Sequence, residues 1–476
     1  MTVRATLGVI AILAATVAVA GCGGGGGDVS ATGGESAASL VPATARAFVA
    51  IDTDFDSDQV KAADDVLKKF PGRNRALAAI RNAMSRSGVD PDALQRSAGP
   101  ELDVALLGAG GDLAVGFTQP SDEDEFIRIL ESADDPPRHM EKDGWTIFSE
   151  SQAGLDAVRD AEDKLADLEP YQDAIAQLPA EALAKGYASA LGIRSITAGG
   201  LGAGAPGGTA PGALKGARWA SAALLAHDDG VEVEGYGATG GGGAAPYAAT
   251  LTDDIPSGSV LALSFRNPGQ ALDQLGSAGT FVLPAIEQAL GVSVAELRAA
   301  LSGEGVLYVR PGTLIPEVAL ITKPADEQRA LATVNRLAQH LAPAGAQATP
   351  TTVSGVPMHK LSLGAVGILY GVVDGKLIVT NSATAVRFVH EGGGESLEDD
   401  KTFQEASDAV GLPDETSGWL YLDFKDGVPL VEALAELAGE ELPAELTENL
   451  RPLRSAILYA SRDGQIQTVN AFVATS

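Results

Sequence analysis

"GVDPDALQRSAGPELDVALLGAGGDLAVGF", residues 88–117, contains the pattern that decides the fold. Its first part has the spacing of a short helix, and two apolar runs separated by a glycine-rich turn follow it. The stretch "GVSVAELRAALSGEGVLYVRPGTLIPEVALI", residues 291–321, repeats the same order with a Pro-Gly turn. Two strands joined by a short turn indicate a β-hairpin, so both stretches predict antiparallel sheet.

Further matches extend this repeat in both directions. Upstream, "VPATARAFVAIDTD" from Val41 matches "IPSGSVLALSFRN" from Ile255, and each predicts a strand. Downstream, three pairs keep their order at nearly constant spacing: "DGWTIFSESQAGLDAV" with "DGKLIVTNSATAVRFV", "YQDAIAQLP" with "FQEASDAVGLP", and "SAALLAHDDGVEVEGY" with "SAILYASRDGQIQTVN". We interpret the chain as two homologous α+β repeats, residues 40–247 and 251–476. Each is expected to be a mostly antiparallel sheet with amphipathic helices packed on it.

Composition shifts mark the boundaries within this plan. The tract from Thr197 to Gly216 has no apolar period and predicts a flexible loop inside the first repeat. The stretch from Gly237 to Pro246 is expected to join the repeats. In the second repeat, residues 428–453 take the place of the first loop and have helical spacing. This difference is a candidate for specialisation, and drift of a loop is the alternative.

The first 22 residues, "MTVRATLGVIAILAATVAVAGC", predict export. The apolar run from Leu7 to Ala20 follows the cationic Arg4 and is shorter than the roughly 20 residues of a membrane span, which is typical of a signal peptide over residues 1–21. Val19 to Cys22 resembles the bacterial lipobox, which implies a lipid on the Cys22 thiol. The glycine-rich residues 22–39 then form a flexible tether. An ordinary secretory signal with an incidental cysteine is the alternative.

Charge and composition limit the classes of partner. The formal net charge is -30, so nucleic acid is not expected as a partner. Apolar residues make up 45% of the chain, which is typical of a folded protein, and its length predicts two or three domains. Cys22 is the only cysteine, which excludes an intrachain disulfide.

The chain resembles a known family. The lipobox, the glycine tether, "SLVPATARAFVAIDTD" followed by "DQVKAADDVLKKFPG", and "GPELDVALL" are similar to bacterial proteins grouped as domain of unknown function 3352. That family occurs largely in high-GC Gram-positive lineages. The resemblance implies an exported, membrane-attached protein with two repeats, and it brings no established activity, cofactor or site residue.

An aspartate-rich stretch is the sharpest candidate for chemistry. Spacing places Asp54, Asp56, Asp58 and Asp65 at positions one, three, five and twelve of a calcium loop. Position six is Gln59 rather than glycine, which makes this a weak metal site. The alternative is a strand end followed by Asp58 as the N-cap of a helix.

Other patterns favour structure over catalysis. The spelling GxGxxG at residues 202–207 lies in a low-complexity tract without a strand before it. Nucleophile and phosphate-loop motifs are absent from the sequence, and most carboxylates are expected on the surface. The tryptophans are expected in the core, and the histidines at the surface or at edges. These residues are Trp145, Trp219, Trp419, His139, His227, His340, His359 and His390.

The sequence therefore predicts a lipoprotein on the outer face of the cytoplasmic membrane. It is expected to be non-enzymatic, to need no cofactor, and to bind an unknown small-molecule or protein ligand. A protein-interaction scaffold of the cell envelope is the alternative, followed by a hydrolase without a recognisable motif.

Overall fold

A computed structural model describes residues 37–108, 113–198, 216–240, 244–268, 291–313, 315–342, 348–363 and 366–476. Cys22, the predicted signal peptide 1–21 and residues 22–36 of the predicted tether lie outside these ranges. The last three residues of the predicted tether, Ala37–Ser39, form a short 3-10 helix with Ala37 and Ala38 buried, so the tether prediction 22–39 extends too far. The chain divides into two compact units. Unit 1 comprises Met1–Gly242, Ala444–Pro452 and Asp463–Ser476, and unit 2 comprises Gly243–Pro443 and Leu453–Arg462. Two C-terminal segments thus belong to unit 1, whereas the repeat boundaries at 247 and 251 remain a prediction from sequence.

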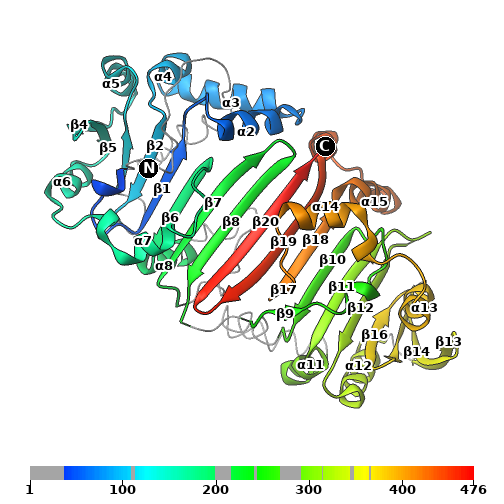
Figure 1. The fold of residues 1–476 in the computed structure, drawn as a ribbon. Helices are drawn as coiled ribbons and strands as arrows, with labels where there is room; N and C mark the ends of the chain where they lie inside the picture. Colours follow the sequence, from blue (N-terminus) through cyan, green and yellow to red (C-terminus); the bar gives the residue numbers. More distant parts are fainter. Residues whose placement is uncertain are drawn as a thin grey trace. The chain divides into compact units, whose positions relative to one another are not determined.

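Unit 1 is an antiparallel sheet with helices packed on it (Figure 1). Its strands are β1 (Ala47–Asp52), β2 (Glu101–Leu106), β3 (Ala114–Thr118), β4 (Arg138–Lys142), β5 (Trp145–Ser149), β6 (Ala184–Ser189), β7 (Trp219–His227), β8 (Gly230–Ala238) and β20 (Ile466–Thr475). They pair in the order β4-β5-β3-β2-β1-β6-β7-β8-β20. The helices are η1 (Ala37–Ser39), α2 (Asp58–Lys68), α3 (Arg73–Arg86), α4 (Pro91–Ser97), α5 (Glu123–Ser132), α6 (Gln152–Asp160), η2 (Leu165–Asp167), α7 (Glu169–Ile175), α8 (Ala190–Ala198) and α16 (Ala444–Leu450).

Unit 2 has the same kind of architecture. Its main strands are β10 (Leu261–Arg266), β11 (Glu304–Arg310), β12 (Glu317–Lys323), β13 (Thr349–Val353), β14 (Val356–Leu363), β15 (Val366–Val373), β16 (Lys376–Thr380), β18 (Gly418–Asp423) and β19 (Leu453–Asp463). They pair in the order β13-β14-β15-β16-β12-β11-β10-β18-β19, and β9 (Tyr247–Ala248) pairs separately with β17 (Glu415–Thr416). The helices are η4 (Thr252–Asp254), α11 (Val294–Ala300), α12 (Glu327–Leu341), α13 (Ala383–Glu391), η5 (Leu397–Asp399), α14 (Lys401–Ala409) and α15 (Phe424–Leu437).

The two sheets follow one plan. The run β5-β3-β2-β1-β6-β7 of unit 1 has the same chain order and pairing as β16-β12-β11-β10-β18-β19 of unit 2. Small details repeat as well: the Leu165 N–H donates to the Val41 carbonyl at 2.8 Å, and the Leu397 N–H donates to the Ile255 carbonyl at 2.7 Å. The predicted α+β class with mostly antiparallel sheet is confirmed.

Two tight turns show why the sequence folds this way locally. Asp143 and Gly144 connect β4 to β5 with φ values of 51° and 79°. Asp374 and Gly375 connect β15 to β16 with φ values of 49° and 81°. Consecutive positive φ values match the twist of an antiparallel hairpin, and Asp-Gly adopts them at low cost. These two turns fix the register of the strands beside them.

The core of unit 1 lies between one sheet face and α6, α7, η1 and η2. Phe48, Ile147, Tyr187 and Trp219 belong to one buried cluster there. Trp145 and Trp419 are also buried, as expected from the sequence. Burial of large aromatic side chains supplies much of the hydrophobic stabilisation of such a core.

Three segments predicted from the sequence can be compared with the helices and strands of the structure. Residues 428–453 are largely helical, in α15 and α16, as predicted. Within the predicted loop 197–216, α8 reaches Ala198, and residues 199–215 lie outside the described ranges. Gly237 and Ala238 belong to β8 rather than to a linker. Across the described part of the chain, helices fall short of the length and apolarity that crossing a membrane requires.

Candidate functional site

The aspartates proposed from the sequence are placed as follows. Asp54 Oδ1 accepts a hydrogen bond of 2.9 Å from the Asp56 N–H, and Asp65 pairs with Lys68 at 2.8 Å. Asp58 is the first residue of α2, and the N-cap is Ser57, whose side chain accepts from the Val60 N–H. The expectation that Asp58 is the cap is therefore wrong by one position.

These carboxylates are not gathered into a metal site. In the described ranges, no group of three or more His, Cys, Asp or Glu side chains could hold a metal ion. The five histidines are half-buried or exposed, as expected. Cys22 and the GxGxxG spelling at 202–207 lie outside the residues that the structure describes.

A cluster of buried ionisable residues lies instead on three neighbouring strands of unit 1. Asp52 at the end of β1 is directly opposite Glu101 at the start of β2. Ala50, two residues before Asp52, is opposite Asp103 on β2 and Lys185 on β6. Opposed residues in antiparallel strands share a face, and so do residues two apart in one strand. The four ionisable side chains, which we call the β1 cluster, therefore lie on one face: Asp52, Glu101, Asp103 and Lys185.

Asp103 is the most deeply buried member, with 0% of its surface exposed. Its Oδ2 accepts a hydrogen bond of 2.8 Å from the backbone N–H of Ala37 in η1. Burial, followed by the negative charge of Glu101, raises the pKa of Asp103 well above its usual range. Asp103 is therefore the member most strongly favoured to hold a proton.

Glu101 and Asp103 interact directly. If both were ionised, Glu101 Oε1 and Asp103 Oδ1 would each be buried without a hydrogen-bond partner among the described residues. A proton on Asp103 removes this conflict because the neutral carboxyl group can donate to the Glu101 carboxylate. Burial raises the pKa of Glu101, whereas this hydrogen bond lowers it. The pair is best described as a carboxyl–carboxylate pair that shares one proton.

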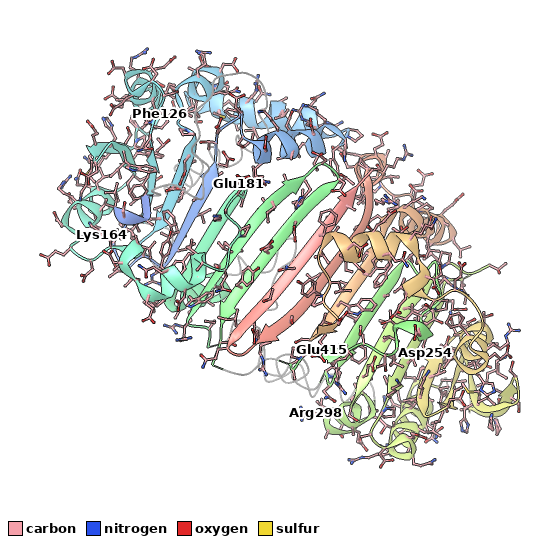
Figure 2. The ribbon with its side chains drawn as sticks, in the orientation of Figure 1. Phe126, Lys164, Glu181, Asp254, Arg298 and Glu415 are labelled. Carbon is pink, nitrogen blue, oxygen red and sulfur yellow. The ribbon has the colours of Figure 1, made fainter. Side chains whose placement is uncertain are left out.

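Asp52 is buried at the rim of the cluster. Burial raises the pKa of Asp52 to about 6, while hydrogen bonds from the Ser57 side chain and the Asp54 N–H act in the opposite direction. The Asp54 N–H lies 2.9 Å from Asp52 Oδ1. The negative charge of Glu181, labelled in Figure 2, also raises the pKa of Asp52. Asp52 can therefore change its protonation state in mildly acidic solution.

Lys185 supplies the positive charge of the cluster. Burial lowers the pKa of Lys185 to about 8, and attraction to Glu101 partly opposes that change. Its Nζ donates to the Ala180 carbonyl at 3.1 Å. Removing an ammonium group from water is costly, so the nearby carboxylate offsets only part of the penalty.

Burial limits the chemistry that the β1 cluster can perform. All four side chains are buried, so a substrate has no direct access to them. Perturbed pKa values often mark active sites, but buried ion-pair networks perturb them too. The cluster is therefore suited to tying together β1, β2, β6 and η1, and it offers no exposed group for acid–base catalysis.

Unit 2 contains a related carboxylate anchor. Glu304, the first residue of β11, accepts from the Leu251 N–H at 2.7 Å and from Thr250 Oγ1 at 2.8 Å. Asp254, labelled in Figure 2, pairs with Lys376 Nζ at 2.6 Å. In each unit, then, a buried carboxylate on the second strand holds the chain segment that precedes the first strand.

The sequence analysis missed the β1 cluster because the residue pattern around it is misleading. Glu101 and Asp103 lie in "GPELDVALL", where acidic and apolar residues alternate. That alternation is typical of a strand with one solvated face. Most carboxylates were expected at the surface, and the buried Asp52, Glu101 and Asp103 are exceptions to that expectation.

Comparison with known proteins gives little further information. No protein family model and no curated protein matches this chain. The "Structure of crystal form IV of TP0453" is 14% identical, with a TM-score of 0.27, over 45% of this chain and 75% of that one. The "Structure of crystal form III of TP0453" is 10% identical, with a TM-score of 0.26, over 47% of this chain and 93% of that one. Scores of this size carry no argument about function.

Proposed function

We propose that this protein is a lipoprotein held on the outer face of the cytoplasmic membrane, where it binds a ligand or partner without catalysing a reaction. The observation that carries the proposal is the sequence from Val19 to Cys22, which has the lipobox order of an aliphatic residue, two small residues and a cysteine. Two or three acyl chains on that cysteine would hold the protein firmly at a bilayer, whereas a single chain would hold it weakly.

The first described residues of unit 1 are compatible with attachment to a flexible tether. About 15 residues separate Cys22 from Ala37, and a glycine-rich coil of this length has a reach of about 20 Å. At Ala37 the chain is attached to the sheet through the Asp103 side chain. A flexible tether that ends at a buried hydrogen bond would keep the folded units close to the membrane surface.

The burial of the β1 cluster supports a non-catalytic role. Its four ionisable residues are at most 6% exposed, which leaves almost no surface at which a reacting molecule could accept or donate a proton. General acid–base catalysis requires such a group within hydrogen-bond reach of the substrate. The proposal therefore assigns the cluster to the stability of unit 1.

Cell fractionation of a Cys22→Ala variant tests the anchor. We expect the unchanged protein in the membrane fraction, labelled by an alkyne-tagged fatty acid and resistant to extraction by high salt. The Cys22→Ala variant should lose the label and leave the membrane fraction. A matched Gly24→Ala variant keeps the cysteine and should behave like the unchanged protein. Membrane attachment of Cys22→Ala, or a missing label on the unchanged protein, would refute the lipid anchor.

A further inference from the structure

Strand β4 is the outermost strand of the unit 1 sheet (Figure 1). Among the described strands it pairs with β5 alone, so its other side presents backbone N–H and C=O groups without a ladder partner. The connection from α5 to β4 is residues 133–137, all of which are described. A hairpin that covers an edge needs about eight residues or more. This connection is therefore too short to cover the edge of β4.

Unit 2 covers the corresponding edge with a strand of its own. Strand β15 corresponds to β4, because each precedes an Asp-Gly turn and pairs across that turn with the next strand. The chain between α12 and β15 includes the hairpin of β13 and β14. Strand β14 pairs antiparallel with β15, and its His359 lies opposite Tyr370, the residue that matches His139 of β4. In one repeat, therefore, an antiparallel strand occupies the edge that is open in the other.

The outermost strand of unit 2, β13, has a proline where a further strand would bond. The two-residue turn Ser354–Gly355 makes Val353 and Val356 a hydrogen-bonded pair. Ladder bonds alternate from that pair, so Pro350 directs its backbone away from β14. Proline has no N–H and cannot donate to a further strand. The edge of unit 2 is thus blocked at this position.

Strand β4 has no such block. The two-residue turn Asp143–Gly144 makes Lys142 and Trp145 a hydrogen-bonded pair. The same alternation then places the N–H and C=O groups of His139 and Glu141 on the outer side of β4. Both residues have an N–H to donate. The open edge of unit 1 therefore keeps the donors and acceptors that an added strand requires.

The side chains of β4 restrict which strand fits beside it. Arg138, Met140 and Lys142 share one face. Arg138 is exposed, and Lys142 Nζ donates to the carbonyl groups of Val158 and Arg159 at 3.3 Å. In the part of the chain that the structure describes, neither cation pairs with a carboxylate. Opposite charges in directly opposed positions are favourable, so this face favours a strand that presents a carboxylate, an apolar side chain and a carboxylate in alternation.

A second copy of this chain is a poor occupant of the same edge. Antiparallel pairing of two β4 strands about Met140 would place Arg138 of each copy opposite Lys142 of the other, and opposed like charges are destabilising. His139 would face Glu141, but imidazole is largely uncharged at neutral pH. The net charge of -30 on each copy adds repulsion. A strand from another protein is therefore the better occupant.

We infer that β4 accepts an extended segment of a partner protein as an additional antiparallel strand, in which carboxylate side chains flank an apolar residue at alternate positions. The inference rests on the proposed binding function and names the kind of partner that this function requires. Backbone hydrogen bonds to β4 would supply affinity, and the face of Arg138 and Lys142 would select the acidic segment. The partner would then complete in unit 1 the pairing that β14 completes in unit 2.

Short fluorescent peptides can test this inference against the full chain purified in a non-ionic detergent. In the acidic peptide, threonines alternate with glutamate, valine and glutamate, and in the basic peptide lysine replaces each glutamate. We expect the acidic peptide to bind at least tenfold more tightly in fluorescence anisotropy. N-methylation of the threonines beside valine should abolish binding, because their N–H groups would face β4. N-methylation of the glutamates should leave binding nearly unchanged, because their N–H groups would point away.

Substitutions on the protein locate the edge. His139→Pro removes an outward donor and should weaken binding of the acidic peptide at least tenfold. Thr352→Pro is its matched control, because it places proline on the outer side of β13, and it should bind like the parent protein. Arg138→Glu should reverse the preference between the peptides, whereas Arg128→Glu, at an exposed arginine of α5, should preserve it. Circular dichroism checks that each variant is folded, and Arg138→Glu keeps the test valid if His139→Pro does not fold.

Several results would overturn the inference. Absence of binding, equal binding of the acidic and basic peptides, full binding after N-methylation beside valine, or an equal loss in Thr352→Pro would each do so. Self-association of the protein that His139→Pro abolishes would also do so, because a second copy would then be the added strand. These variants all keep Cys22 and should fractionate with the membrane like the unchanged protein, which separates failure of this inference from failure of the anchor.

Discussion

The backbone N–H of Ala37 donates a 2.8 Å hydrogen bond to Asp103 Oδ2, a residue 66 positions further along the chain. In unit 2 the Leu251 N–H, which matches that of Ala37 in the repeat, donates to Glu304 Oε1 at 2.7 Å, and Glu304 matches Glu101, two residues before Asp103. Both acceptors are buried carboxylates on the second strand of their sheet. A buried acceptor that holds a backbone N–H is costly to remove because the N–H is left without a partner. The repeat therefore preserves an attachment point for the segment before its first strand.

Asp103→Ala and Asp103→Asn should separate the hydrogen bond from the charge. The alanine variant loses the acceptor for Ala37 and the donor to Glu101, so its free energy of unfolding should fall by about 2–4 kcal/mol. Asparagine can accept from Ala37 and donate to Glu101, so its change should stay within about 1 kcal/mol. Urea unfolding measures both values, and hydrogen exchange at Ala37 should accelerate only in the alanine variant. Equal losses in the two variants would contradict this assignment.

Asp52→Asn should change how stability depends on pH. Because the folded-state pKa of Asp52 is raised to about 6, the folded protein binds a proton more tightly than the unfolded chain does. The stabilisation from this group is complete below the unfolded pKa, near 4, and is lost as pH rises through 6. Asparagine does not titrate, so the variant should gain on the order of 2 kcal/mol relative to the parent between pH 4 and pH 7. Urea unfolding at several pH values checks this, and parallel curves would exclude it.

Much of the fold could be predicted because its signals are local. The Asp-Gly pairs at 143–144 and 374–375 specify hairpin turns, and the repeated order of segments specifies one plan for both halves. Pairing of β1 with both β2 and β6 could not be predicted, because its register depends on contacts between distant parts of the chain. The cap of α2 was misplaced because Ser57 and Asp58 are both good capping residues. The backbone becomes helical only after Ser57, and local composition does not reveal that point.

The β1 cluster could not be predicted for a different reason. In β2 the acidic residues Glu101 and Asp103 alternate with Leu102 and Val104, which resembles a strand with one solvated face. In the fold, Leu102 packs with Leu94 and Phe126 in one cluster, while Asp103 lies beneath η1. Both faces of β2 are thus covered, and strand periodicity alone cannot show that a second layer covers the acidic face.

Two buried tyrosines should respond in opposite directions to removal of their hydroxyl groups. Tyr421 has no hydrogen-bond partner for its hydroxyl among the described residues, whereas the Tyr308 hydroxyl donates to Glu317 Oε1 at 3.1 Å. Tyr421→Phe should therefore leave stability unchanged or raise it by up to about 1 kcal/mol. Tyr308→Phe should lower it by about 1–2 kcal/mol, because buried Glu317 loses a donor. Thermal and urea unfolding compare the two, and a larger loss for Tyr421→Phe would show that its hydroxyl is bonded.

Ser57→Ala and Asp58→Ala distinguish the cap of α2 from its neighbour and test the aspartate-rich stretch. The Ser57 side chain accepts from the Val60 N–H at 3.1 Å, so losing it should cost about 1 kcal/mol. Asp58 is the first helical residue and acts only through the helix dipole, so its loss should cost a few tenths of that amount.

Millimolar calcium should leave the melting temperature unchanged, because Asp54 is bonded to the Asp56 N–H and Asp65 to Lys68. A calcium-induced rise in melting temperature that Asp65→Asn abolishes would restore the metal-site interpretation.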